Sequence, residues 1–542
     1  MPSRGRSSKA ARTIYVCFAP LLWSTRAQSR NHRCMHLLVA TRKCPCRSRP
    51  LQLAVSLDMS FPETQNAYSL EGIASFAEEL VKKNKQKEDE TAKTSVCLAI
   101  AGGGGHAISA LSATPGASSL LLEGTVAYDR KSYCSYVNLP TNTKGFKYSS
   151  YESAKMASEA ALKKALNYIS TNNLKRMGGC VGVGCASTLV TSSVKGSDRS
   201  HANIVATAAD GGQLYLNVTL AGQQDGVTRS RLEEDYFVSN LVLRAIQRLK
   251  LADGRGKVFD SATTTELGDS IHESWSGFSG DGDDDDQDAP FVAANQILSE
   301  EAKSVLLLPV CSGTSTKFRA LKYSVIPSGS LVFPGSFNPP HSGHVTLASA
   351  AVKAAKNTLA EDVRSRTREP PIFFELSLIN ADKPPIDPRT VSDRLNRMLE
   401  LQGLPEKWGI LLTRAPLFAE KLTCIDECIL DSSHGPLPKV SFVIGSDTML
   451  RIVDPKYYGH NQTTMVETIR SMNGVHFVVG GRVEQNKDMS APRRFVEGSK
   501  ELLRLPQDIQ SMFTIIEEKD FRVDISSTEI RQLERANGAK GD

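Results

Sequence analysis

Two histidines three residues apart, His341 and His344, follow an apolar run, Leu331 to Phe333, and a turn rich in glycine and proline. The run predicts a β-strand, and residues 345–359 predict a helix. The first N–H groups of a helix have no internal partner and lie at the positive end of its dipole, so a phosphate is stabilised there. Residues i and i+3 share a helix face, so both imidazoles can approach one phosphate chain. The stretch therefore predicts an anion site.

A second candidate lies near the C-terminus, where Asp524 to Arg531 read DISSTEIR. Ser526 and Glu529 have the spacing of a capping box, which needs no ligand. A capped helix start is nevertheless an anion site, and Arg531, one turn into the helix, could reach the same phosphate. Both interpretations can hold together.

These stretches resemble the HxGH and ISSTxxR motifs of the nucleotidylyltransferase superfamily. The resemblance implies a Rossmann-like parallel sheet that binds a nucleoside triphosphate, with His341, His344, Lys383 and Arg531 as catalytic residues. Gly445 and Asp447 match the G-x-D nucleotide segment of the family. The nucleotide-binding residues that it implies are Gly335, Ser336, Phe337, Asn338, Gly445, Asp447, Ile525, Ser526, Ser527 and Thr528.

The polar turns after the other predicted strands complete the pocket, because open α/β sheets bind ligands beyond the carboxyl ends of their strands. These turns, and the predicted helix that carries Arg394 and Arg397 on one side, supply candidate substrate-binding residues, Asn380, Arg394, Arg414 and Phe418. A phosphomonoester that attacks the α-phosphate of a nucleotide is already ionised, so the protein must align it and neutralise developing charge. Mg²⁺ held mainly by substrate phosphates would help, and we expect no metal site built from side chains.

The adenylyltransferase form of the C-terminal motif favours transfer of AMP from ATP to nicotinamide or nicotinate mononucleotide, releasing pyrophosphate, in NAD biosynthesis. Two alternatives stay open. One is an adenylyl- or cytidylyltransferase for another phosphomonoester, and the other is a catalytically silent nucleotide-binding protein.

An α/β domain is also predicted for residues 65–252. Val96 to Ala101 reads as a buried strand that runs into four glycines and His106. Pro115 to Ser118 and Gly124 to Tyr128 resemble segments of the C-terminal domain of competence-damage-inducible proteins, the nicotinamide-nucleotide amidase family. Ala101 stands where that family has its nucleophilic serine. A methyl group cannot attack an amide carbon, so we expect no amidase activity.

Charge is unevenly distributed along the 542 residues. Residues 1–57 hold eleven Arg or Lys and no Asp or Glu, and the whole chain has a net charge of +6, so the remainder carries −5. We therefore expect no nucleic-acid partner. Residues 1–58 suggest either an organellar leader, for mitochondrion or plastid, or a misassigned start before Met59 that leaves the protein cytoplasmic.

Residues 253–315 predict a disordered acidic linker, since six aspartates between Asp281 and Asp288 repel one another. The nucleotidyltransferase domain is expected over 316–542. No apolar run is long enough to span a bilayer, so no membrane partner is expected. A homo-oligomer is an open alternative.

Overall fold

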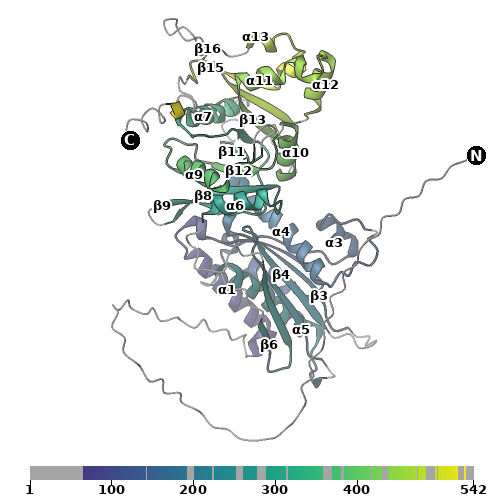
Figure 1. Cartoon of the computed structure of the whole chain (residues 1–542). Helices are drawn as coiled ribbons and strands as arrows, with labels where there is room; N and C mark the ends of the chain where they lie inside the picture. Colours follow the sequence, from purple (N-terminus) through teal and green to yellow (C-terminus); the bar gives the residue numbers. More distant parts are fainter. Residues whose placement is uncertain are drawn as a thin grey trace, which may run out of the picture. The chain divides into compact units, whose positions relative to one another are not determined.

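The computed structural model describes residues 65–141, 143–191, 200–222, 225–251, 261–276, 288–312, 315–357, 369–379, 384–416, 418–429, 438–472, 474–483, 495–496, 499–522 and 530–532. They form two large sheets, each with its own covering helices (Figure 1). We call each sheet with its helices a layer, the first and the second in chain order. The α/β fold class is therefore confirmed. Residues 1–58 and the aspartate run from Asp281 to Asp286 lie outside the described residues.

The first sheet has the order β2-β1-β3-β4-β5-β7-β6 and is mixed. Its strands β2, β1 and β3 are parallel, and the remaining pairs are antiparallel. The elements of this layer are η1 (Gln65–Tyr68), α1 (Leu70–Lys85), η2 (Glu90–Ala92), β1 (Ser95–Ala101), α2 (His106–Ala113), η3 (Ala117–Ser119), β2 (Leu121–Val126), α3 (Arg130–Tyr136), α4 (Tyr151–Asn172), η4 (Leu174–Gly179), β3 (Cys180–Thr188), β4 (His201–Ala208), β5 (Gln213–Thr219), α5 (Arg231–Ile246), the π-helical turn η6 (Gln247–Leu251), β6 (Ser261–Thr264) and β7 (Ser270–Ser276).

The second sheet has the order β17-β14-β13-β10-β11-β12-β8-β9. From β17 to β12 all pairs are parallel, whereas β8 and β9 form an antiparallel edge. Its elements are α6 (Ala289–Leu298), β8 (Ser304–Ser312), β9 (Ser315–Leu321), β10 (Ser330–Pro334), α7 (Ser342–Asn357), β11 (Ile372–Ser377), α9 (Pro388–Leu399), β12 (Trp408–Thr413), α10 (Phe418–Cys428), β13 (Val440–Gly445), α11 (Ser446–Ile452), η7 (Pro455–Tyr458), α12 (Gln462–Ser471), β14 (Val475–Gly480), β15 (Arg482–Val483), β16 (Phe495–Val496), α13 (Ser499–Leu502), α14 (Gln507–Gln510) and β17 (Phe513–Ile516).

The helices of the second layer divide between the two faces of its sheet. Buried residues of α7 and α9 share one hydrophobic cluster with Leu331 and Phe374. Buried residues of α10 and α12 share another with Val332 and Phe373, on the opposite face. The chain thus runs from β10 outward to β12 along one face and returns to β13 along the other. This change of direction makes the carboxyl ends of β10 and β13 the topological switch point, where open α/β sheets bind ligands.

The predicted linker is wrong over much of its length. β6 and β7 complete the first sheet, while α6 and β8 belong to the second. The β7 sequence, SIHESWS, is polar, but antiparallel pairing with β5 satisfies its backbone, and Glu273 is buried against Arg248 at 2.6 Å. Tertiary pairing therefore stabilises a strand that local composition does not predict.

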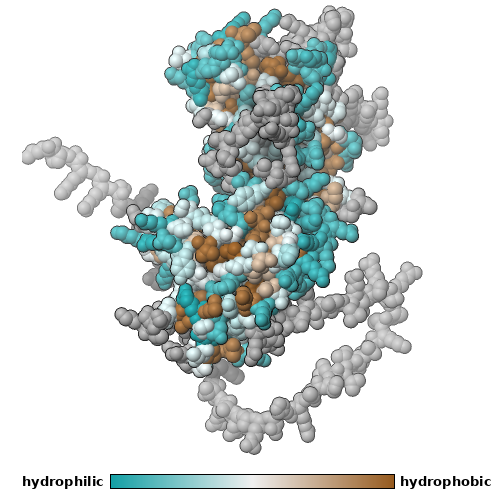
Figure 2. Space-filling view, turned by 180° about the vertical axis from the view of Figure 1, so that it is seen from behind, coloured by the Kyte–Doolittle hydropathy of each residue, from teal (hydrophilic) through white to brown (hydrophobic). Residues whose placement is uncertain are grey.

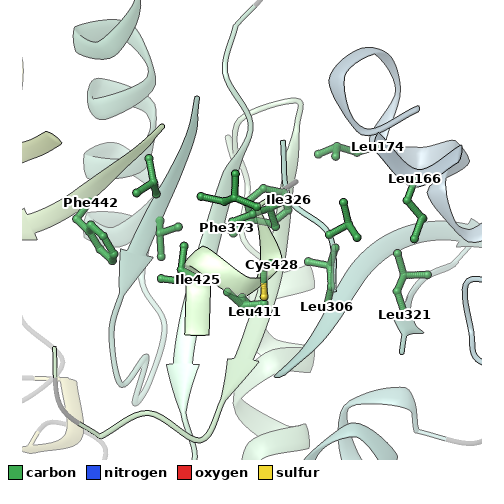
Figure 3. Packing of buried hydrophobic residues seen from close by; sticks show 14 of the residues in the cluster. Leu166, Leu174, Leu306, Leu321, Ile326, Phe373, Leu411, Ile425, Cys428 and Phe442 are labelled. Atoms are coloured by element: carbon green, nitrogen blue, oxygen red, sulfur yellow. The ribbon is translucent and has the colours of Figure 1, made fainter. Parts of the chain in front are cut away.

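One hydrophobic cluster continues from the first layer into the second. Leu166 of α4 and Leu174 of η4 share it with Leu306 of β8 and Leu321 of β9, and it extends to Leu411 of β12 (Figure 3). All five side chains are buried. The apolar side chains of Leu306 and Leu321 in the edge hairpin of the second sheet are thus covered by α4 and η4.

Hydrophobic residues elsewhere on the surface lie in several groups separated by hydrophilic ones (Figure 2). Single exposed apolar side chains are normal in globular proteins and need no partner. None of the helices in the described ranges is both long and apolar enough to cross a bilayer.

Glycine on β3 allows α4 to lie directly on the first sheet. A Cβ at Gly182 would come within 2.0 Å of the Ser158 carbonyl oxygen and 2.3 Å of the Leu162 nitrogen, both backbone atoms of α4. We expect Gly182→Ala to lower the free energy of unfolding by about 1–3 kcal/mol, because the helix must move away. Thermal and urea unfolding would measure this. Gly222→Ala is the control, since a Cβ there meets nothing within 4 Å, and equal losses from both variants would contradict the argument.

Candidate functional site

The buried ring of Phe337 anchors the loop between β10 and α7, which comprises residues Gly335 to His341. That ring is 1% exposed and lies 5.7 Å from Phe333, 5.5 Å from Phe374 and 5.1 Å from His344, measured between ring centroids. A Cβ at Gly335 would come within 2.6 Å of the Phe337 ring, so the fold requires glycine there. Phe337 can therefore contribute to a nucleotide site only through its backbone.

The two histidines lie at the start of α7, which begins at Ser342, three residues earlier than predicted. Their ring centroids are 3.9 Å apart. The N–H of His341 donates to Nδ1 of His344, and the N–H of Gly343 donates to Nδ1 of His341, both at 3.1 Å. Because each Nδ1 accepts a hydrogen bond, each neutral ring carries its proton on Nε2. Both rings thus retain one N–H donor.

Burial keeps both rings uncharged. It lowers the pKa of His341, and burial together with the neighbouring His341 ring lowers the pKa of His344 to about 3. Desolvation disfavours the charged imidazolium, which is the cause in both cases. At neutral pH the pair therefore offers hydrogen-bond donors to an anion but no full positive charge.

Full positive charge comes from two arginines that bind the same loop. Arg531 donates through Nη1 to the carbonyl oxygen of Asn338. Arg394, on α9, donates through Nη1 to the carbonyl oxygen of Ser336 at 3.3 Å. The arginine of the C-terminal motif thus contacts the histidine loop across 193 residues of sequence.

A cavity of about 460 Å³ lies beside these arginines. Its lining residues are Asn338, Pro339, Thr390, Asp393, Arg394, Arg397 and Arg531. Burial, and then the charge of Arg531, lower the pKa of Arg394. Like charges gathered in a partly desolvated space are stabilised by an anion, so the cavity suits a polyphosphate.

Residues at the N-terminus of helix α9 fix its position beside the cavity. Asp387 accepts the N–H of Thr390 at 3.0 Å, and Pro388 occupies the first helical position. Such a cap satisfies a donor that the helix leaves free and fixes where the helix begins. Arg394 and Arg397, three residues apart, therefore share the face that lines the cavity. Arg397 was not among the predicted substrate-binding residues, although its i+3 spacing from Arg394 places it on the same helix face.

Gly445 and Asp447 lie at the carboxyl end of β13, the strand that pairs with β10. A Cβ at Gly445 would meet nothing within 4 Å, so the backbone is open to approach there. Asp447 is in the first turn of α11. Both predicted residues thus lie at the topological switch point, on its β13 side.

Two of the predicted substrate-binding residues, Arg414 and Phe418, contact other parts of the protein. Arg414 pairs with Glu300 at 2.7 Å and donates to the Leu298 carbonyl oxygen at 3.4 Å. The Phe418 ring lies 4.9 Å from that of Phe442 and is partly buried. Neither lines the arginine cavity. The predicted residues that lie outside the described ranges are Asn380, Lys383, Ile525, Ser526, Ser527 and Thr528.

A second cavity, of about 440 Å³, lies in the first layer at the carboxyl end of β1. Ala101 and Tyr128 are among its lining residues. Ser187, also at its wall, accepts the Gly103 N–H at 2.6 Å and donates to the Gly103 carbonyl oxygen at 3.2 Å. This hydroxyl is therefore committed to the backbone rather than free to attack a substrate.

A search of protein-family models finds no match for this chain. A curated protein of Schizosaccharomyces pombe, named "Putative nicotinamide mononucleotide adenylyltransferase", is 30% identical over 129 residues, which are 23% of this chain and 43% of that protein. The chain thus spans less than half the length of this relative.

Solved structures of competence-damage proteins are similar to about a third of the chain. CihA from Agrobacterium tumefaciens is 17% identical with a TM-score of 0.25, covering 33% of this chain and 93% of that one. The protein from Enterobacter cloacae is 14% identical with a TM-score of 0.24, covering 32% and 90%.

The depressed pKa of His344 makes a prediction about stability and pH. The folded protein binds fewer protons than the unfolded chain between about pH 3 and 6.5, so stability falls as the pH is lowered through this range. The loss from one such group is at most about 1.4 kcal/mol per pH unit. We expect the stability difference between the unsubstituted protein and His344→Gln, measured by urea unfolding, to shrink between pH 7 and pH 5. A difference that stays constant would contradict this, and the exposed His272→Gln controls for the substitution.

The arginine cavity predicts binding of pyrophosphate. Ligands that bind only the folded state raise its stability by mass action, by about 2.7 kcal/mol at a hundred times Kd. We expect pyrophosphate to raise the melting temperature, and Arg394→Met to remove at least about half of the rise. Differential scanning fluorimetry measures both. Arg470→Met, at an exposed pair with Asp508, should keep the full rise, and a loss in this control would show that the effect is nonspecific.

Proposed function

We propose that the second domain transfers the adenylyl group of ATP to a pyridine mononucleotide, nicotinamide or nicotinate mononucleotide, and releases pyrophosphate. The observation that carries the proposal is the hydrogen bond from Arg531 to the Asn338 carbonyl, which joins the two motifs at one loop. The similarity to a relative named for this activity supports it at the level of nucleotidyl transfer in NAD biosynthesis.

In the proposed reaction a phosphate oxygen of the mononucleotide attacks the α-phosphorus of ATP. A new P–O bond forms, the bond between the α-phosphorus and its bridging oxygen breaks, and pyrophosphate leaves with the electron pair. The attacking phosphate is already ionised at neutral pH, so no general base is needed. Catalysis then consists of alignment and of stabilising charge on the phosphoryl oxygens.

The residues at the loop have properties that suit these tasks. The Nε2–H groups of His341 and His344 can donate to phosphate oxygens without adding charge. Arg394, Arg397 and Arg531 can neutralise the leaving pyrophosphate. Lys383, which the family resemblance also implies, stays a prediction.

Mg²⁺ is part of the proposal as an ion that enters with the phosphates. Among the described residues no group of three His, Cys, Asp or Glu side chains could hold a metal ion, and the cavity that suits the phosphates has three arginines and one carboxylate, Asp393, among its lining residues. Phosphate oxygens are ligands that Mg²⁺ prefers, and the bound ion would neutralise charge on them.

We also propose that the first domain hydrolyses no amide. Ala101 offers no nucleophile at the carboxyl end of β1, and Ser187 is bound to the Gly103 backbone. The domain would then bind a ligand without hydrolysing it, or have a structural role.

The test is pyrophosphate release by the full chain with Mg²⁺, a pyridine mononucleotide and either ATP or CTP. We expect release with ATP, and we expect His344→Ala to lower kcat by about 10²–10³, as the loss of one preorganised donor does. Circular dichroism would show an intact fold, and the exposed His272→Ala serves as the control.

Other outcomes separate the alternatives. Release only with another phosphomonoester, or only with CTP, would replace the proposed substrates. No release with any acceptor, despite nucleotide binding in fluorimetry, would indicate a silent nucleotide-binding protein.

A further inference from the structure

A fully buried carboxylate lies one strand away from the histidine loop. Glu375, on β11, is 0% exposed and faces Pro334 of β10 in the parallel register. Its carbonyl oxygen accepts the N–H of Gly335 at 3.0 Å, which connects it directly to the first residue of the loop. No motif in the sequence indicates Glu375, and the reaction proposed above does not use it.

Two side chains bind this carboxylate from other elements. Lys421 Nζ donates to Oε1 and Oε2 at 2.8 Å each, and Thr413 donates to Oε1 at 2.5 Å. Burial raises the pKa of Glu375, and the charge of Lys421 opposes this rise. A buried ion pair often contributes no more stability than an apolar pair of similar volume, whereas it does fix the geometry of the groups that it joins.

Thr413 and Lys421 lie on either side of the connection between β12 and α10, and both bind Glu375. Thr413 is the last residue of β12, and Lys421 is in the first turn of α10. At the start of the connection, the Arg414 N–H donates to the Lys303 carbonyl oxygen at 3.3 Å. At its end, the Phe418 ring packs on Phe442. The connection is thus held at both ends, and both ends are bound to Glu375.

The connection lies on the side of the sheet that the arginines leave free. Thr390, Arg394 and Arg397 come from α9, which packs on one face, whereas α10 packs on the other. The histidine loop begins at the carboxyl end of β10 and the connection at that of β12, with β11, the strand of Glu375, between them. The ligands of such parallel sheets bind at these ends. If the arginine cavity takes the nucleotide phosphates, the α10 side is left for the acceptor.

We propose that Glu375, Lys421 and Thr413 are positioning residues that hold the β12–α10 connection as the wall against which the phosphomonoester acceptor binds. This inference rests on the proposed function. None of the three side chains lines the arginine cavity, so their loss should raise KM for the acceptor and leave KM for ATP unchanged.

The test measures both KM values in the full chain. Lys421→Met should raise KM for the acceptor about tenfold, since a small displacement of a substrate wall costs that much or more, with KM for ATP within about twofold. Because Lys421→Met leaves a buried carboxylate unpaired, it should also lower the melting temperature. The double variant Glu375→Gln/Lys421→Met removes that charge, so it should recover most of the melting temperature while the acceptor KM stays raised. Lys421→Arg, which keeps the charge, should recover part of the acceptor KM.

The matched control is Glu427→Gln. Glu427 is on α10, as Lys421 is, and pairs with Lys303 at 3.0 Å, but both side chains are exposed, so neither KM should change. Acceptor KM values that return to normal in the double variant, or equal changes in both KM values, would overturn the inference and leave a purely structural pair.

Failure of the proposed function gives a different result. If pyridine mononucleotides are not used, pyrophosphate release identifies the acceptor that is used, and the same KM comparison is made with it. A chain that turns over no phosphomonoester overturns both proposals.

Discussion

The candidate site depends on hydrogen bonds from two guanidinium groups to the backbone of one loop. Arg531 binds the carbonyl of Asn338 and Arg394 binds that of Ser336. The loop itself is anchored by the buried Phe337 ring. Without these contacts the turn after β10 would be an ordinary surface connection. With them, two helices from distant parts of the chain place positive charge beside the first turn of α7.

The histidines and the arginines contribute differently to the electrostatics of the site. Burial makes His341 and His344 neutral, so they act as oriented donors that need no reorganisation. The arginines stay charged because guanidinium deprotonates far above neutral pH. An arrangement of neutral donors on one side and fixed cations on the other suits a phosphate chain whose charge shifts from one phosphorus to the next. The two faces of the sheet add a further division, with α9 on the arginine side and α10, tied to Glu375, on the other.

Much of the second layer could be predicted from local patterns. Each of four strands is a short apolar run closed by a polar turn, and the sequence predicts them over residues 372–378, 408–413, 441–444 and 475–479. β12 has the predicted bounds, and β11, β13 and β14 differ from prediction by one residue at their ends. The prediction missed β4 and β17 and gave β6 and β7 to a linker. Their stability comes from backbone pairing with neighbours far along the chain, as between Tyr215 and Ser274, and no local period reports such pairing.

The sequence by itself determined the chemistry that the chain can offer: two histidines at a helix start, an arginine in a second motif, and an alanine where a nucleophile would stand. Only the tertiary structure decided which of these groups meet. It brought Arg531 and Arg394 to one loop, left Arg414 with Glu300, and buried Glu375 against Lys421. The physical reason is that residue type and helical or strand period are local properties. Burial, which sets the pKa of His344 and selects the partner of Glu375, depends on how the sheet and helices pack.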